Sequence, residues 1–193
     1  MRTFVMIVVL AGALPAWADS VWEIDPAHSS VQFSVRHMMV SNVRGAFTKV
    51  AGTVRGDEQD PTLAGVEATI DTSSIDTREA KRDEHLRSPD FLDVAKYPTM
   101  TFHSKKIAKT GDGRYDVTGD LTLHGVTREV VLHVEGPSPA MKDPRGGLRA
   151  GASATTRIDR RDFGITWSKA LDGGGVVVGN DIDVTIDVEG VKK

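Results

Sequence analysis

The chain of 193 residues contains no cysteine. It therefore has no disulfide, no thiolate nucleophile, no cysteine-ligated metal and no lipid-modified N-terminal cysteine. Its fold must be held by a hydrophobic core, and a chain of this length can build one within a single domain. Aromatic residues are scarce as well, with six Phe, three Trp and two Tyr. Few large side chains are thus available to fill an interior at the density of a protein core.

The chain also lacks a concentration of charge of one sign. Its formal net charge is −3, and acidic and basic residues are interspersed along the sequence. The densest basic cluster is Arg160-Arg161, which is flanked directly by Asp159 and Asp162. Because a nucleic-acid site needs a continuous basic surface to displace counterions, we expect no nucleic-acid partner.

Sequence motifs of enzymes and metal sites are absent too. The chain has no Gly-x-Ser-x-Gly, no Gly-x-Gly-x-x-Gly, no phosphate-binding loop and no HExxH. Its six histidines are scattered over the sequence. We therefore expect no resident metal, no cofactor and no catalytic activity. The enzymatic alternative is a hydrolase or lyase acting on an apolar substrate, which would need His37 or His103 beside an aspartate.

One long hydrophobic run is present, at the N-terminus. Phe4–Leu14 follows Arg2 and precedes Ala16-Trp17-Ala18, a small-residue cleavage pattern. The run has about half of the ~20 residues that a membrane-spanning helix needs. We interpret residues 1–18 as a cleaved signal peptide and residues 19–193 as a single mature domain. An exported chain without disulfides indicates a bacterial periplasm.

Most of the remaining sequence alternates between apolar and polar residues with a period of two, as strands with one buried face do. Val31–Val35 shows this alternation, and so do the longer stretches Tyr115–Leu123 and Val176–Val188. Turns rich in Gly and Pro separate such stretches, including the triplet Gly173-Gly174-Gly175. Short connections of this kind favour an antiparallel, all-β fold.

One polar segment interrupts this pattern. Arg78–Arg87 contains few β-branched residues, and Asp76 followed three residues later by Glu79 resembles a capping box. The helix should end by Ser88, because the residue before Pro89 is pushed out of the helical region. We expect one short helix that lies across another surface.

The amphipathic sheet must close into a barrel or double over into a sandwich to bury its apolar face. The stretch Leu148–Ile158 places mostly alanine on its core-facing side, and Gly119 interrupts the apolar side of another strand. These small residues leave interior volume, which favours a hollow barrel. In the alternative, the alanines pack against Phe or Trp and no space is left.

Several charged residues beside the expected apolar interior are candidates to hold the polar head group of a bound lipid. They are Arg82 and His85 on the expected helix, and Arg160 and Arg161 before Phe163. In the alternative, each arginine pairs with a neighbouring aspartate at the surface.

The order of motifs along the chain resembles that of the YceI-like family of exported bacterial proteins, from about Trp22 to Val188. The motifs that carry the resemblance are Ile24–Ser29, Gly45–Phe47, Asp71–Thr77, Arg82–Leu86, Asp90–Asp93, Tyr97–Phe102, Gly119–Thr127 and Arg160–Ile165. The resemblance implies a lipocalin-like, eight-stranded antiparallel β-barrel with one short helix. It also implies an elongated internal cavity that takes a polyisoprenoid chain.

From this resemblance and the apolar strand faces, we expect a periplasmic binding or carrier protein for a long-chain polyisoprenoid or an isoprenoid quinone. An isoprene unit of five carbons costs roughly 4 kcal/mol to expose to water, so a long tail needs a dry cavity. The alternative is a non-catalytic, stress-related interaction module whose barrel is filled by its own side chains. The sequence does not decide whether the protein contacts a membrane transiently or whether it forms a homodimer. The residues expected to bind the lipid tail are Phe33, Val35, Phe47, Leu86, Phe91, Met100, Phe102, Leu121 and Trp167.

Overall fold

A computed structural model describes residues 20–193, so the expected signal peptide, residues 1–18, lies outside the described residues. The described part is all-β apart from one α-helix and three short 3-10 helices, and none of its helices is long and apolar enough to cross a membrane. The strands are β1 (Ser20–Ile24), β2 (Ser30–His37), β3 (Ser41–Phe47), β4 (Val50–Gly56), β5 (Gly65–Asp71), β6 (Ile75–Asp76), β7 (Thr99–Gly111), β8 (Arg114–Leu123), β9 (Val126–Glu135), β10 (Met141–Lys142), β11 (Leu148–Asp159) and β12 (Val178–Lys192). The helices are α1 (Ala80–Arg87), η1 (Pro61–Leu63), η2 (Thr72–Ser74) and η3 (Arg160–Phe163).

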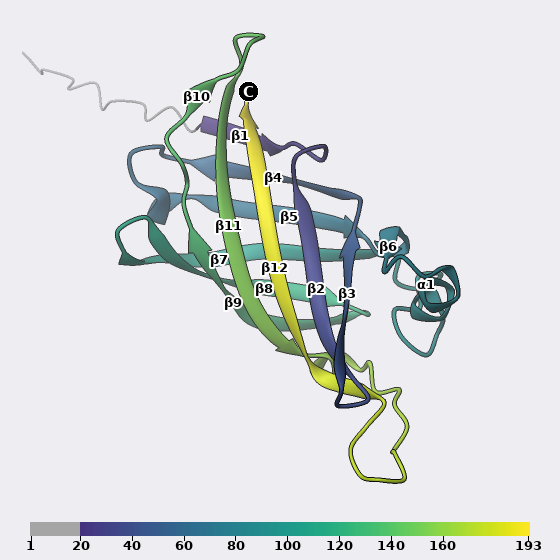
Figure 1. Cartoon of the computed structure of the whole chain (residues 1–193). Coiled ribbons are helices and arrows are strands. Elements are labelled where there is room, and N and C mark those ends of the chain that lie inside the picture. Colours follow the sequence, from purple (N-terminus) through teal and green to yellow (C-terminus); the bar gives the residue numbers. More distant parts are fainter. Residues whose placement is uncertain (1–19) are drawn as a thin grey trace, which may run out of the picture.

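Eight strands form a closed antiparallel barrel in the order β12-β1-β4-β5-β7-β8-β9-β11, and pairing of β11 with β12 completes the ring. The closing pair is long, with Arg149 opposite Val191 at one end and Asp159 opposite Asp181 at the other. In contrast, β9 and β11 pair only over Ser153–Thr155. In Figure 1, β11, β12 and β2 run steeply across the front of β4, β5, β7 and β8. The predicted all-β, eight-stranded antiparallel barrel is confirmed.

The second edge of β12 is shared by two strands. β1 pairs with its last residues, where Trp22 lies opposite Lys192, and β2 pairs with the part from Val178 to Asp187. β2 then pairs with β3, and β3 with the short strand β6. The sheet therefore continues beyond the ring as a β2–β3 hairpin.

The single short helix is confirmed, but its expected start is wrong. Arg78 has a φ of 63°, in the left-handed region, so the helix cannot begin there. Glu79 is the N-cap instead, and its carboxylate accepts hydrogen bonds from two backbone N–H groups of the first turn. The Asp76 carboxylate accepts from the Arg78 amide and does not cap the helix. The helix ends before Ser88, as predicted.

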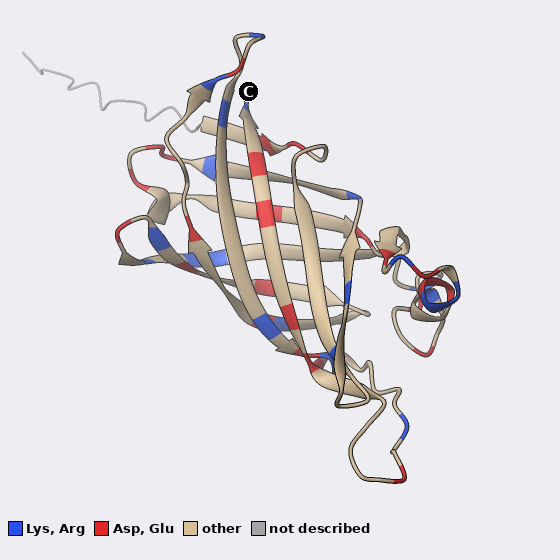
Figure 2. Ribbon diagram, in the orientation of Figure 1, with Lys and Arg blue, Asp and Glu red and all other residues tan. Residues whose placement is uncertain are grey.

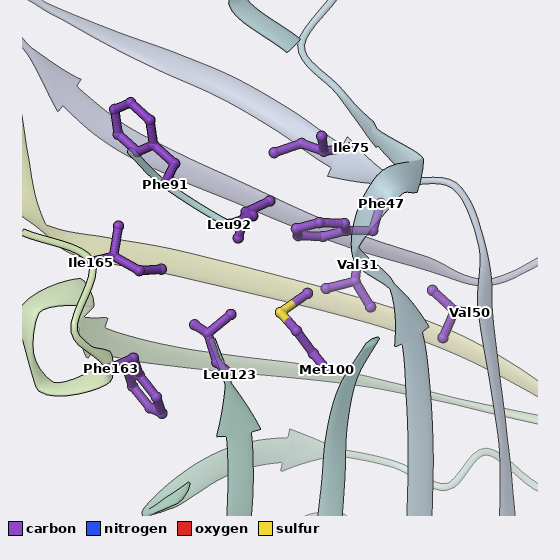
Figure 3. Close-up of a cluster of buried hydrophobic side chains, with 10 residues drawn as sticks. All are labelled: Val31, Phe47, Val50, Ile75, Phe91, Leu92, Met100, Leu123, Phe163 and Ile165. Carbon is purple, nitrogen blue, oxygen red and sulfur yellow. The ribbon is translucent and has the colours of Figure 1, made fainter. Parts of the chain in front are cut away.

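A cluster of buried apolar side chains lies at the end of the barrel next to α1. Buried apolar side chains from β2, β3, β4, β6, β7 and β8 meet there, as Figure 3 shows. Phe91 and Leu92, from the loop after α1, and Phe163 and Ile165, from η3 and the residues after it, complete the cluster. These two segments cover this end of the barrel.

Candidate functional site

The barrel encloses a cavity of about 400 Å³, a volume within the usual range of ligand sites. Strands on opposite sides of the ring contribute to its wall. Each strand contributes alternate residues, because these point to the same side. β12 contributes Val184 and Ile186 from the apolar half of its alternating sequence. On the other side, β5 contributes Val66 and β7 contributes Phe102.

The wall of the cavity is almost entirely apolar. Its residues with polar side chains are Tyr115, Ser153, Thr156 and Arg160. The Ser153 hydroxyl donates to the Asp187 carboxylate over 2.7 Å and is therefore already engaged. Among the described residues, no histidine and no carboxylate lines the cavity. Such a wall offers contacts to a hydrocarbon chain and leaves a charged group without partners.

The structure places most of the expected tail-binding residues in the wall. Trp167 is the exception: it packs on Phe91, with ring centroids 5.1 Å apart, and on His85, without lining the cavity. Contact of any of these residues with a lipid stays a prediction. The residues found in the wall are Phe33, Val35, Phe47, Leu86, Phe91, Met100, Phe102 and Leu121.

The small residues of the sequence have two different effects on the interior. Ala152 and Ala154 of β11 line the cavity, as predicted. The expectation that Gly119 leaves interior volume is wrong. A β-carbon at this position would lie 2.4 Å from Cζ of Phe102. The Phe102 ring occupies the space that the missing side chain leaves. A small residue thus creates a void only where no large neighbour turns into it.

Other wall residues were not among those predicted. Val54 of β4, Val66 of β5, and Leu132 and Val134 of β9 all line the cavity. Each sits in an alternating stretch of sequence, so the period-two pattern also indicates that these residues face the interior.

Arg160 is a buried arginine, and its guanidinium is fully occupied within the protein. Its side chain lines the cavity, and the residue is only 4% exposed. Burial lowers the pKa of Arg160, since it penalises the charged form. All five of its N–H groups have acceptors. Nε donates to the Gly179 carbonyl (2.9 Å), and Nη1 donates to the carbonyls of Ile165 and Trp167 (both 2.8 Å). Nη2 donates to the Val178 carbonyl (3.4 Å) and to Asn180 Oδ1 (3.3 Å). The guanidinium therefore ties the segment after η3 to the start of β12 and has no free donor for a head group.

The other three head-group candidates do not line the cavity, although His85 packs on the wall residue Phe91. Arg82 donates to the Thr77 hydroxyl and carbonyl, over 2.7 and 2.9 Å. The His85 ring lies 2.9 Å from the Asp90 carboxylate. Arg161 is exposed and pairs with Asp159, which raises the pKa of the arginine and lowers that of Asp159 to about 2. Each of the four candidates is thus engaged within the protein, and two of them, His85 and Arg160, contact Trp167.

A second polar cluster lies where β11, β12 and the β1–β2 turn meet. The Arg149 guanidinium contacts the carboxylates of Asp25 (2.7 Å), Asp143 (2.9 Å) and Glu189. These contacts hold the pKa of Asp25 well below its usual range. Asp25, Glu189 and His28 lie close enough together to bind a metal ion, but the Arg149 cation already pairs with both carboxylates. The cluster is an ion-pair network that joins distant parts of the chain, and separation in sequence hid it from our predictions.

The fold and the cavity together define a hollow antiparallel barrel of the size that holds a single ligand. The chain belongs to the YceI-like domain family, whose sequence model matches residues 22–190. It is 41% identical over 191 residues to Protein YceI of Escherichia coli O157:H7, covering 99% of this chain and 95% of that protein.

Two solved structures show the same barrel. The crystal structure of the Campylobacter jejuni YCEI protein has a TM-score of 0.68 at 32% identity, covering 82% of this chain and 90% of the other. A domain from Saccharophagus degradans, described as a polyisoprenoid-binding domain implicated in plant cell wall breakdown, has a TM-score of 0.63 at 16% identity. That match covers 89% of this chain and 98% of the domain, and at this identity it shows a shared fold.

Proposed function

We propose that this protein is a periplasmic binding or carrier protein that holds the tail of a long-chain polyisoprenoid or an isoprenoid quinone in its cavity. The observation that carries the proposal is the apolar wall, which has no free charged group. A five-carbon isoprene unit gains roughly 4 kcal/mol on leaving water, and a wall of Val, Ile, Leu and Phe provides the dry surroundings that this gain requires.

The chemistry of the wall also favours the tail over the head group as the bound part. Arg160 is the one charged residue along the described wall, and all its N–H groups are engaged. A charged head inside the cavity would lose its hydration without gaining a partner. The tail therefore enters the barrel, and the head stays in contact with water.

Binding without catalysis suits this wall better than an enzymatic reaction. An acid or base must reach the reacting atoms within hydrogen-bond distance. His103, the candidate base, is exposed and lies beside Glu67 of the neighbouring strand β5. His37 lies at the end of β2 and is also not part of the wall. The alternative of an interaction module with a filled barrel is disfavoured by the cavity itself.

Export to the periplasm is part of the proposal. The apolar run before Ala16-Trp17-Ala18 fits a cleaved signal peptide, and a chain without cysteine needs no disulfide formation after export. Such a protein meets prenyl lipids of the bacterial membranes and shields their tails from water.

The proposal is tested by purifying the exported protein and extracting it with organic solvent. We expect mass spectra of the extract to show a stoichiometric prenyl lipid, and stripped protein to take up added isoprenoid quinone. N-terminal sequencing of the same sample should begin at Asp19. No prenyl lipid in the extract and no uptake of added quinone would exclude the binding function.

A further inference from the structure

The turn between β2 and β3 is an exposed apolar tip. Met38, Met39 and Val40 are 43%, 53% and 76% exposed. The strands on either side are paired up to His37 and Ser41, so these three residues form the whole turn. We call Met38–Val40 the hairpin tip. Large apolar side chains gathered on a projecting turn are typical of a binding surface.

The backbone holds the hairpin tip in one conformation. Met38 and Met39 have φ values of 48° and 61°, as the central residues of a tight hairpin turn do, although Asn-Gly is the favoured pair there. The Val40 amide donates to the His37 carbonyl over 3.1 Å. The Arg36 guanidinium donates to the Met39 carbonyl over 2.7 Å. A hydrogen-bonded turn thus leaves both methionines partly exposed, and the Met39 side chain lies against Gly175 of the loop before β12.

The hairpin that carries the tip is basic. Residues 26–56 include Arg36, Arg44, Lys49 and Arg55 but no Asp or Glu, although the whole chain has a net charge of −3. Figure 2 shows basic and no acidic residues on β2 and β3, whereas several acidic residues follow one another along β12. Arg36 and Arg44, on either side of the tip, are exposed.

Acidic residues near the hairpin do not cancel this charge. Asp183 of β12, which lies beside Ser34 of β2, is paired with Arg157 over 2.6 Å. The loop before β12 carries one exposed acidic residue, Asp172, and one exposed basic residue, Lys169, three positions earlier. Asp181 of β12, next to Ile182, is exposed as well; it lies opposite Asp159 and near Arg161, which pairs with Asp159. The acidic residues of β12 thus have basic neighbours of their own, and the β2–β3 hairpin itself carries the two arginines and no acidic residue.

The tip also continues from the cavity wall. Val35, three residues before Met38, lines the cavity, and so does Val178, which lies opposite His37. The Met38 amide donates to the Val177 carbonyl over 2.9 Å, which joins the tip to the start of β12. Residues of the cavity wall thus lie within a few positions of the tip on both strands.

We propose that the hairpin tip docks the protein on a bilayer that contains anionic phospholipid. Met38, Met39 and Val40 enter the interface between head groups and acyl chains, while Arg36 and Arg44 face the phosphates. The strength of membrane binding depends on the apolar area inserted and on the attraction between basic side chains and anionic lipids. Here the two contributions together give reversible binding. This inference rests on the proposed function, because a carrier of a membrane lipid must meet the membrane to load or release it.

Co-sedimentation with vesicles tests the docking surface. The mature protein is mixed with vesicles of phosphatidylcholine and phosphatidylglycerol in equal parts, or of phosphatidylcholine alone. We expect binding to the anionic vesicles that weakens as salt is added, because exposed charges are screened. If the wild-type protein does not co-sediment with the anionic vesicles, the proposal is overturned.

Paired substitutions localise the contact. The variant Met38→Asn, Met39→Asn removes the apolar side chains but keeps the left-handed turn, which asparagine tolerates better than methionine. We expect its binding to anionic vesicles to be weaker by roughly tenfold or more. Arg44→Gln should weaken binding by about fivefold. The control is Met141→Ser, at a methionine of β10 that is 72% exposed and lies outside the hairpin.

The outcomes separate this inference from the proposed function. Met38→Asn, Met39→Asn should still take up isoprenoid quinone supplied in detergent, because neither residue lines the cavity. Equal binding by this variant and the wild type would refute the tip as the docking site, as would an equal loss in Met141→Ser. Native mass spectrometry that showed a dimer abolished by the double substitution would assign the tip to a second copy of the chain instead.

Discussion

Replacing Arg160 with lysine should destabilise the protein although the positive charge is kept. The guanidinium satisfies five acceptors in the native structure, and an ammonium group has only three N–H groups on a single nitrogen. At least two acceptors must therefore lose their donor. The two with the longest native bonds, the Val178 carbonyl (3.4 Å) and Asn180 Oδ1 (3.3 Å), are those we expect to be lost.

The magnitude follows from the burial of these acceptors. A buried polar group without a partner costs ~1–3 kcal/mol, and the lower part of this range applies because the lost bonds are long and Asn180 is half-buried. The free energy of unfolding should thus fall by about 2–4 kcal/mol. For a domain of this size, this corresponds to a Tm lower by roughly 4–16 °C.

Calorimetric unfolding of the mature protein measures this change. The matched control is Arg161→Lys, because Arg161 is the next residue, is exposed, and makes a surface ion pair with Asp159. Such pairs contribute less than about 1 kcal/mol, so the control should shift Tm only slightly. An unchanged Tm in Arg160→Lys, with weaker binding of a prenyl lipid that has an anionic head group, would refute our structural role for Arg160 and restore the head-group role.

Three further predictions concern the cavity, the packing and the pH dependence. Ala152→Phe places a ring in the cavity and should weaken uptake of isoprenoid quinone by roughly tenfold, whereas Ala51→Phe, at an exposed position of β4 outside the wall, should leave uptake unchanged. Gly119→Ala forces a β-carbon against Phe102 and should lower the free energy of unfolding by ~1–3 kcal/mol, whereas Gly173→Ala, with no atom within 4 Å of an added β-carbon, should have little effect in thermal unfolding. Arg161 lowers the pKa of Asp159 from 3.8 to about 2, so the stability from this pair should be complete above the unfolded pKa and be lost as the pH falls toward 2. Tm measured against pH should show that decline, and Asp159→Asn should reduce it.

The sequence predicts the strands and the inner face of the barrel well, because both depend on a local pattern. In β12, Ile182, Val184 and Ile186 alternate with aspartate and threonine, and these apolar residues form the cavity wall. Closure of the ring depends on pairing between β11 and β12 and on the partial pairing of β9 with β11. Alternation within a strand does not specify its partner. The preference for a hollow barrel came from the small residues of Leu148–Ile158, and the number of strands came from the family resemblance.

The environment of individual side chains could not be predicted in the same way. Arg160 and Arg161 are adjacent and flanked symmetrically by aspartates, yet the first is buried among carbonyl groups and the second is exposed. The short helix η3 decides which of them turns inward. Likewise, Gly119 and Ala152 are both small residues on inner faces, but only the tertiary structure shows that Phe102 fills the space at the first.

A hollow barrel needs a source of stability that does not depend on filling its centre. Side chains that face a void lose part of the dispersion energy that a packed core gains. Here the backbone hydrogen bonds of the closed ring, the packed cluster beside α1 and the Arg149 network hold the wall independently of its contents. An apolar chain that enters the cavity restores the missing contacts without reorganising that framework. Because such a ligand binds the folded and not the unfolded chain, loading with isoprenoid quinone should raise Tm in proportion to the logarithm of the free ligand concentration, and the rise should be smaller in Ala152→Phe than in the wild type.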